Sequence, residues 1–236
     1  MAESVGTVGD GLLGTFNVFV DPVSTAQKVP SKMSWVWPVL LLAVIYLVFA
    51  YLMLPYALQL MDATLAQRNV PSEQMDRTRS MMHASAQITT PLTPVFVIGF
   101  IALFALLIKV AFTMMDVRPK FRDVFSLLAA CSLIPALQYV ASYFVLRAKG
   151  DPVESAEQIT PPFGLDIFFS NLHGPALAFL SYFSIFQIWF LVVLCIGLAA
   201  LTRTSKTKAF IAMTPAWVIP LLMRLLGAMF TRSSTS

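Results

Sequence analysis

The feature that most constrains this chain is a stretch without a charged residue, which runs from Met33 to Met61. A hydrocarbon core about 30 Å thick is crossed by roughly 20 apolar residues, because each residue advances an α-helix by about 1.5 Å. Inside the stretch lies the apolar run WVWPVLLLAVIYLVFAYLMLPYAL, which is long enough for such a crossing. The sequence therefore predicts a protein that resides in a membrane.

The composition supports the same class and excludes another. Hydrophobic residues make up 58% of the 236 residues and charged residues only 12%, whereas about a quarter of a soluble domain is charged. The formal net charge is +4, and the cations lie in short turns and not in a continuous basic stripe with aromatic residues. This pattern argues against nucleic acid as the main partner. We predict an all-α fold, a polytopic integral membrane helix bundle.

Apolar runs of sufficient length predict five transmembrane helices. From Ile167 to Thr202 there is no acidic residue, Lys or Arg, which is too long for one straight span. We expect residues 167–174 to lie at the interface and the fourth span to begin at Pro175. In the fifth run, Pro215 and Pro220 can kink the helix. The predicted spans cover about residues 35–58, 92–115, 124–146, 175–201 and 209–230, within a membrane domain of residues 33–231 that is followed by a short tail, 232–236.

The segment of residues 1–32 is predicted to be cytoplasmic and to contain an amphipathic interfacial helix. Its apolar residues recur at spacings of three and four, which is typical of a short helix on a membrane surface. Asp21 can cap a second helix that begins at Pro22. The alternative is a frayed tail that leads into the first span. The spaced apolar residues are Leu12, Leu13, Phe16, Phe19, Val20 and Val23.

Lysine and arginine in short loops predict the orientation, because cytoplasmic loops carry an excess of these residues. With a cytoplasmic amino terminus, QKVPSK, DVRPKFRD and the turn after Leu201 lie inside, and five spans place the carboxyl terminus outside. We predict a multi-pass protein of the cell membrane, the inner membrane in a bacterium. The lipid bilayer and its anionic headgroups are the expected partners. The topology cations are Arg118, Lys120, Arg122, Arg203, Lys206 and Lys208.

Three segments carry a resemblance to a known family. They are TFNVFVDPVSTAQKV before a first span that starts with Trp and Pro, KVAFTMMDVRPKFRDVFSLLAACSLIPAL between the second and third spans, and FSIFQIWFLVVLCIGLAALTRTSKTKAF around the fourth. In order and spacing they resemble the Yip1 domain family, in its compact bacterial type. The resemblance implies a five-helix membrane protein with a cytoplasmic amino terminus. Eukaryotic relatives are associated with vesicle trafficking, Rab GTPases and membrane shaping, so the resemblance also implies a trafficking-like role.

The sequence offers little for catalysis. No G-x-S-x-G, H-E-x-x-H or P-loop pattern occurs. A dyad of His173 with Ser181 or Ser184 can be drawn, but a histidine whose hydrogen bonds are satisfied at the interface is the favoured interpretation. We therefore predict that the protein is not an enzyme and has no catalytic residues, no metal and no cofactor.

Four polar residues are candidates at membrane depth: Gln138, Gln187, His173 and Arg224. Polar groups there are functional candidates by default, and a small transporter or channel with a polar path near the two glutamines is one hypothesis. No Asp or Glu lies inside a predicted span, so a proton-coupled relay lacks its usual carboxylate. Packing between helices is the favoured role of the glutamines. Arg224 can extend outward to water, which is the expected arrangement, or face a polar partner in the bundle.

The leading functional hypothesis is a non-enzymatic membrane protein that organises or scaffolds the bilayer or binds partners. Those partners include a second copy of the chain, as a homo-oligomer, or other membrane proteins. The transporter or channel is the alternative. Gly197 and Ala199 are small residues just before the last basic turn, and they are predicted to let the fourth and fifth spans approach closely.

Overall fold

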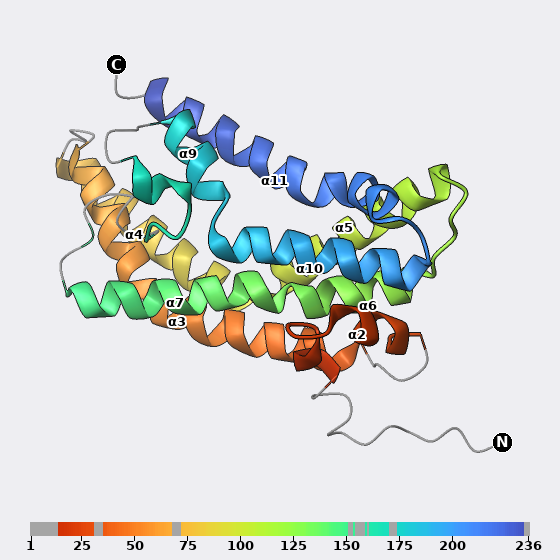
Figure 1. Ribbon diagram of the computed structural model, residues 1–236. Helices are drawn as coiled ribbons and strands as arrows, with labels where there is room; N and C mark the ends of the chain where they lie inside the picture. The colour runs from red at the N-terminus through yellow and green to blue at the C-terminus, as the bar shows by residue number, and fades with distance from the viewer. Residues whose placement is uncertain are drawn as a thin grey trace. The chain divides into compact units, whose positions relative to one another are not determined.

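The computed structural model describes residues 14–30, 35–67, 72–150, 153, 159, 161–169 and 174–233 (Figure 1). Within these residues the regular structure is helical, and a single isolated bridge joins Gly164 and Ser184. After a helical turn at residues 14–17, the main helices are α2 (Pro22–Lys28), α3 (Val36–Gln67), α4 (Ser72–Thr89), α5 (Thr93–Met114), α6 (Phe121–Cys131), α7 (Leu133–Lys149), α9 (Pro175–Tyr182), α10 (Ile185–Thr202) and α11 (Lys206–Ser233). Two short 3₁₀ helices are η1 (Thr90–Leu92) and η2 (Leu165–Phe168).

Five helical stretches are long and apolar enough to cross a membrane, which confirms the predicted class of helical membrane bundle. They are Val36–Ala66, Gln74–Met114, Phe121–Lys149, Ile185–Thr202 and Lys206–Met229. Large apolar side chains on them are exposed, such as Val44 and Phe96. An exposed apolar surface of this kind is stable when lipid covers it. Where the membrane begins and ends along these helices stays a prediction.

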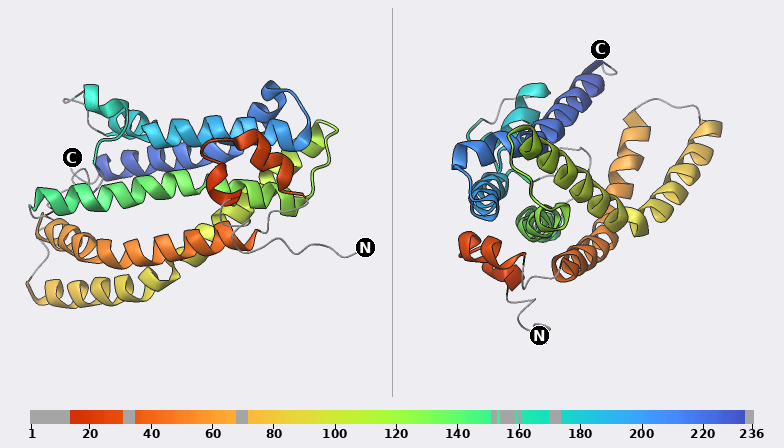
Figure 2. Two further views of the ribbon diagram at one scale, coloured as in Figure 1. Left: turned by 60° about the horizontal axis from the view of Figure 1, so that its bottom comes forward. Right: turned by 90° about the vertical axis from the view of Figure 1, so that its right-hand side faces the viewer.

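The chain forms two compact units, and the first consists of residues 1–41, 98–135 and 162–236. Inside this unit α10 packs against α2, α6 and α11, and both views of Figure 2 show α2 beside α10. Its fully buried side chains include Leu127 of α6, Leu194 and Leu198 of α10, and Met213 of α11. This apolar packing holds the beginning of α6 beside the end of α10, and the first candidate site lies there.

The second unit consists of residues 42–97 and 136–161. Its core is aromatic: the rings of Tyr46 and Tyr139 stack with centroids 5.5 Å apart, and Phe49 meets Tyr143 edge-on at 5.6 Å. Offset and edge-on ring pairs add to the free energy of area burial, by about 0.5–1.5 kcal/mol each. The aromatic pairs therefore fix the part of α3 in this unit against α7.

The break at Asp21-Pro22 is confirmed as a helix start. The carboxylate Oδ1 of Asp21 accepts a hydrogen bond from the Ser24 N–H at 3.0 Å, and Pro22 is the first residue of α2. Proline is favoured at this position because its missing N–H would have no partner within the helix. The segment before it is less regular than a continuous helix, since residues 18–20 form a turn. Leu12 and Leu13 lie outside the described residues.

The fourth predicted span needs a correction. The sequence predicts one helix from Pro175, but the structure interrupts it at Phe183 and begins the long helix α10 at Ile185. The Ser184 side chain caps α10 by accepting from the Gln187 N–H at 3.1 Å. The Ile185 N–H donates to the Phe163 carbonyl at 3.0 Å. The backbone groups freed by the break are therefore satisfied by a distant loop, which no local pattern reveals.

Candidate functional sites

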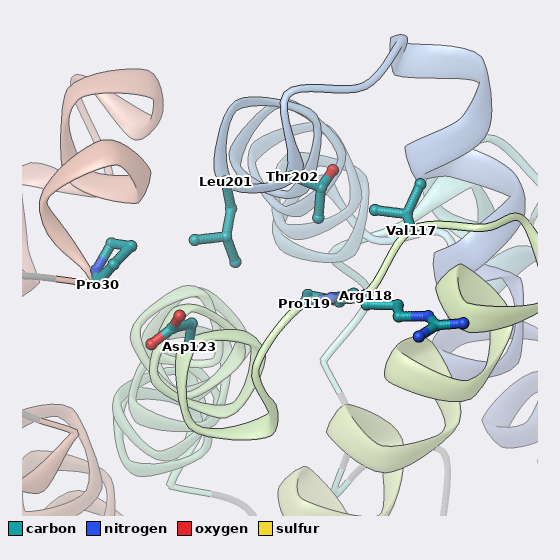
Figure 3. Close-up of a pocket in the computed structure, with 7 residues that line it drawn as sticks. All are labelled: Pro30, Val117, Arg118, Pro119, Asp123, Leu201 and Thr202. Carbon is teal, nitrogen blue, oxygen red and sulfur yellow. The ribbon is translucent and has the colours of Figure 1, made fainter.

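A cavity of about 260 Å³ lies at the basic end of the first unit. Its walls come from the segment after α2, from the connection between α5 and α6 together with the first turn of α6, and from the last turn of α10. Figure 3 shows the seven lining residues: Pro30, Val117, Arg118, Pro119, Asp123, Leu201 and Thr202. These are the three segments in which the sequence places its basic turns, so the structure brings them to one end of the unit.

Backbone geometry shapes this end of the unit. After α5 the chain reverses at Asp116, whose φ of 60° is in the left-handed region, and the Val117 N–H donates to the Phe112 carbonyl at 3.0 Å. Arg203 ends α10 in the same way, with φ of 53° and its N–H bonded to the Ala199 carbonyl. Both turns therefore close tightly without a glycine.

The cavity contains one acidic and one basic side chain that do not pair with each other. In Figure 3 the Arg118 guanidinium extends to one side of Pro119, and the Asp123 carboxylate lies on the other side, toward Pro30. Among the described residues, neither side chain has an ion-pair or hydrogen-bond partner. Asp123 is in the first turn of α6, where a negative charge is favoured by the helix dipole. The cavity therefore offers separate sites of negative and positive charge.

The six topology cations are all exposed in the structure. Arg118 lines the cavity, while the other five are not among its lining residues. Their role in orientation stays a prediction. The six residues are Arg118, Lys120, Arg122, Arg203, Lys206 and Lys208.

A polar cluster forms at the start of α10 and includes two of the candidate intramembrane residues. The Gln187 Nε2 donates to the Tyr182 hydroxyl at 3.3 Å, and that hydroxyl donates to the Trp217 carbonyl at 2.8 Å. The Arg224 Nη2 donates to Ser181 Oγ at 2.9 Å. Arg224 therefore has a partner inside the bundle, contrary to the expected outward arrangement. The cluster joins α9, α10 and α11 through side chains, and Tyr182 and Trp217 were not anticipated from the sequence.

Two further features bear on charge in this cluster. The Arg224 guanidinium also interacts electrostatically with Asp166 of η2, whose carboxylate accepts from the Gly164 N–H at 3.0 Å. Trp217 Nε1 is buried without a hydrogen-bond partner in the part of the chain that the structure describes. Within the described residues, the cluster thus contains a guanidinium that interacts with an acid, and one buried donor without a partner.

The remaining candidate residues do not join the cluster within the described structure. His173 lies outside the described residues, so the structure does not test the hypothetical catalytic dyad of His173 with Ser181 or Ser184. Gln138 lies in α7, in the second unit, while Gln187 belongs to the first. Neither glutamine lines the cavity. These observations do not favour the transporter or channel.

An ion cluster in the second unit joins the end of α3 to α4. Asp62 Oδ1 accepts from Arg79 Nε at 2.7 Å and lies 3.2 Å from His83 Nε2. His83 is therefore part of α4 and makes a polar contact with α3. Because Arg79 is largely exposed, the pair contributes little to stability. We assign it a structural role in holding α4 against α3.

The fold and these sites define a multi-pass helical membrane protein whose polar groups gather at helix ends. The Yip1 domain model matches residues 16–227, nearly the whole sequence. The chain belongs to the Yip1 family, as the resemblance of its three segments predicted. No curated protein and no solved structure matches it.

Proposed function

We propose that this protein organises the membrane without catalysis, by seating its amino-terminal lead, residues 14–30, at the bilayer interface beside α10. The observation that carries the proposal is that the lead has two different faces. Val18, Ala26 and Val29 are buried, and the Phe19 ring contacts Trp189 of α10 at 5.5 Å. The lead is therefore attached to the bundle through one face.

The other face of the lead is apolar and open. Phe16, Val20 and Val23 are 50%, 88% and 42% exposed. An apolar helix face beside a membrane span inserts into the boundary between headgroups and acyl chains, where it displaces lipid in one leaflet. Because the lead is attached to α10, that displacement occurs at a fixed place next to the bundle. This mode of action agrees with the membrane-shaping role implied by the family.

The proposal includes an orientation and partners. The lead and the basic turns face the cytoplasm, in the cell membrane, and the carboxyl terminus is outside. Membrane organisation also involves self-association or contact with other membrane proteins, through the exposed apolar faces of the spans. No catalytic residue, metal or cofactor has a part in it.

Reconstitution into liposomes tests the proposal. Wild-type protein should change vesicle diameter or produce tubules in electron micrographs, relative to vesicles without protein at the same lipid composition. The double variant Phe16→Ser/Val20→Ser should lose most of this effect while inserting equally well. The matched control is Gln27→Ser, on the same segment, since Gln27 is an exposed polar residue. Unchanged vesicles with wild-type protein, or an equal effect of the double variant, would refute the proposal.

A further inference from the structure

Two residues that line the cavity at the basic end carry opposite charges, and neither has an ion-pair partner in the part of the chain that the structure describes. Asp123 and Arg118 both line it, and Figure 3 shows their charged groups on opposite sides of Pro119. A purely anionic ligand would be repelled by Asp123, and a purely cationic one by Arg118. A ligand with a positive group for Asp123 and a negative group for Arg118 would match both residues.

The position of the cavity indicates where such a ligand comes from. Arg118 lies in the connection between two candidate spans, Asp123 lies in the first turn of the second of them, and Leu201 and Thr202 are the last residues of a third. Apolar helices end where the hydrocarbon core ends, so this connection is at the depth of the lipid headgroups. Leu201, Val117 and the two prolines add apolar wall beside the charges, which suits a lipid more than a free ion.

We propose that the cavity binds the headgroup of an amine-bearing zwitterionic phospholipid, phosphatidylethanolamine. The ammonium group donates hydrogen bonds to the Asp123 carboxylate, and the phosphate lies toward the Arg118 guanidinium. Both contacts are charge-assisted hydrogen bonds, the stronger kind. The Thr202 hydroxyl is already engaged, since it donates to the Leu198 carbonyl at 2.7 Å and lies 2.8 Å from the Thr204 hydroxyl, so Asp123 and Arg118 provide the polar contacts to the ligand. This inference is independent of the proposed membrane organisation, which rests on the lead.

A headgroup series tests the inference without any substitution. Native mass spectrometry of the purified protein would compare phosphatidylethanolamine, its monomethyl and dimethyl derivatives, and phosphatidylcholine, with identical acyl chains. Bound lipid should fall along the series, because each methyl group removes one N–H donor. Equal retention of the first and last members would overturn the proposal, and so would stronger retention of phosphatidylglycerol. Soluble phosphoethanolamine should compete poorly, and efficient competition would overturn the assignment to a lipid.

Two matched variants locate the site. Asp123→Asn should lower the preference for phosphatidylethanolamine over phosphatidylcholine by about tenfold, as expected when one charged partner of a hydrogen bond is neutralised. The control Asp116→Asn changes the net charge equally. Asp116 lies in the connection before α6 and outside the cavity lining, and asparagine tolerates its left-handed backbone. It should leave the preference intact. Arg118→Gln should weaken all phospholipids alike. Equal effects of the two aspartate variants would refute the assigned site.

Discussion

A close contact between Gly197 and Leu127 gives the sharpest test of the packing inside the first unit. A Cβ atom added at Gly197 would lie 3.1 Å and 3.2 Å from the two terminal carbons of Leu127. Ordinary contacts of this kind begin at 3.4 Å, so even one added carbon requires Leu127 to shift by a few tenths of an ångström. Leu127 is fully buried and has little room to do so.

We expect Gly197→Leu to destabilise the protein by about 1–2 kcal/mol. Overpacking of a filled core costs about 1–3 kcal/mol, and removing a glycine from a helix returns up to about 1 kcal/mol. Leu127→Ala alone should cost about 2–5 kcal/mol, because it leaves a cavity. In the double variant the new side chain fills that cavity, so the combined loss should be smaller than the sum by about 1–3 kcal/mol.

Unfolding of the detergent-solubilised protein by sodium dodecyl sulfate would measure these changes. Gly99→Leu is the control, because Gly99 lies on α5 with nothing within 4 Å of an added Cβ. It should be neutral or slightly stabilising. The reasoning fails if the two glycine variants are equally stable, or if the losses in the double variant simply add.

Two more predictions concern local hydrogen bonds. Ser181→Ala removes the hydrogen-bond partner of Arg224 and should lower the free energy of unfolding by about 1 kcal/mol. The double variant Ser181→Ala/Arg224→Leu should recover part of that loss in the same unfolding assay. A larger loss in the double variant would contradict this prediction. Asp21→Ala removes the cap of α2 and should destabilise that helix by about 1 kcal/mol, which amide exchange would detect as faster exchange in residues 22–28. Asp21→Ser keeps a capping oxygen and should exchange like wild type. Equal exchange in all three proteins would show that the cap is dispensable.

Features with a short-range cause were predictable from the sequence. The uncharged run from Met33 to Met61 predicts α3 because hydrophobic length alone decides whether a helix can span a membrane. The start of α2 follows from Asp21 and Pro22, whose preferences operate within one helical turn. The family could be recognised for a similar reason, because the order and spacing of the apolar segments can be seen directly in one sequence.

Features with a long-range cause were not predictable. The interruption before α10 depends on Phe163 and Gly164, which lie outside the apolar run that they interrupt. The partner of Arg224 is Ser181 on another helix, so its choice between water and protein depends on packing. Gly197 was expected to face the fifth span, but an added Cβ there meets Leu127 of α6. A small residue predicts a close approach without specifying the neighbour.

The left-handed backbone of Arg203 determines which substitutions are favourable at the end of α10. A left-handed residue with a side chain costs roughly 1–2 kcal/mol relative to glycine, which usually occupies this position. Glycine at 203 would thus relieve the backbone and at the same time delete a cation from the basic end. The two effects act on different properties, folding stability and charge at the membrane surface. A search for more stable variants would select glycine here, and selection for correct insertion would retain arginine.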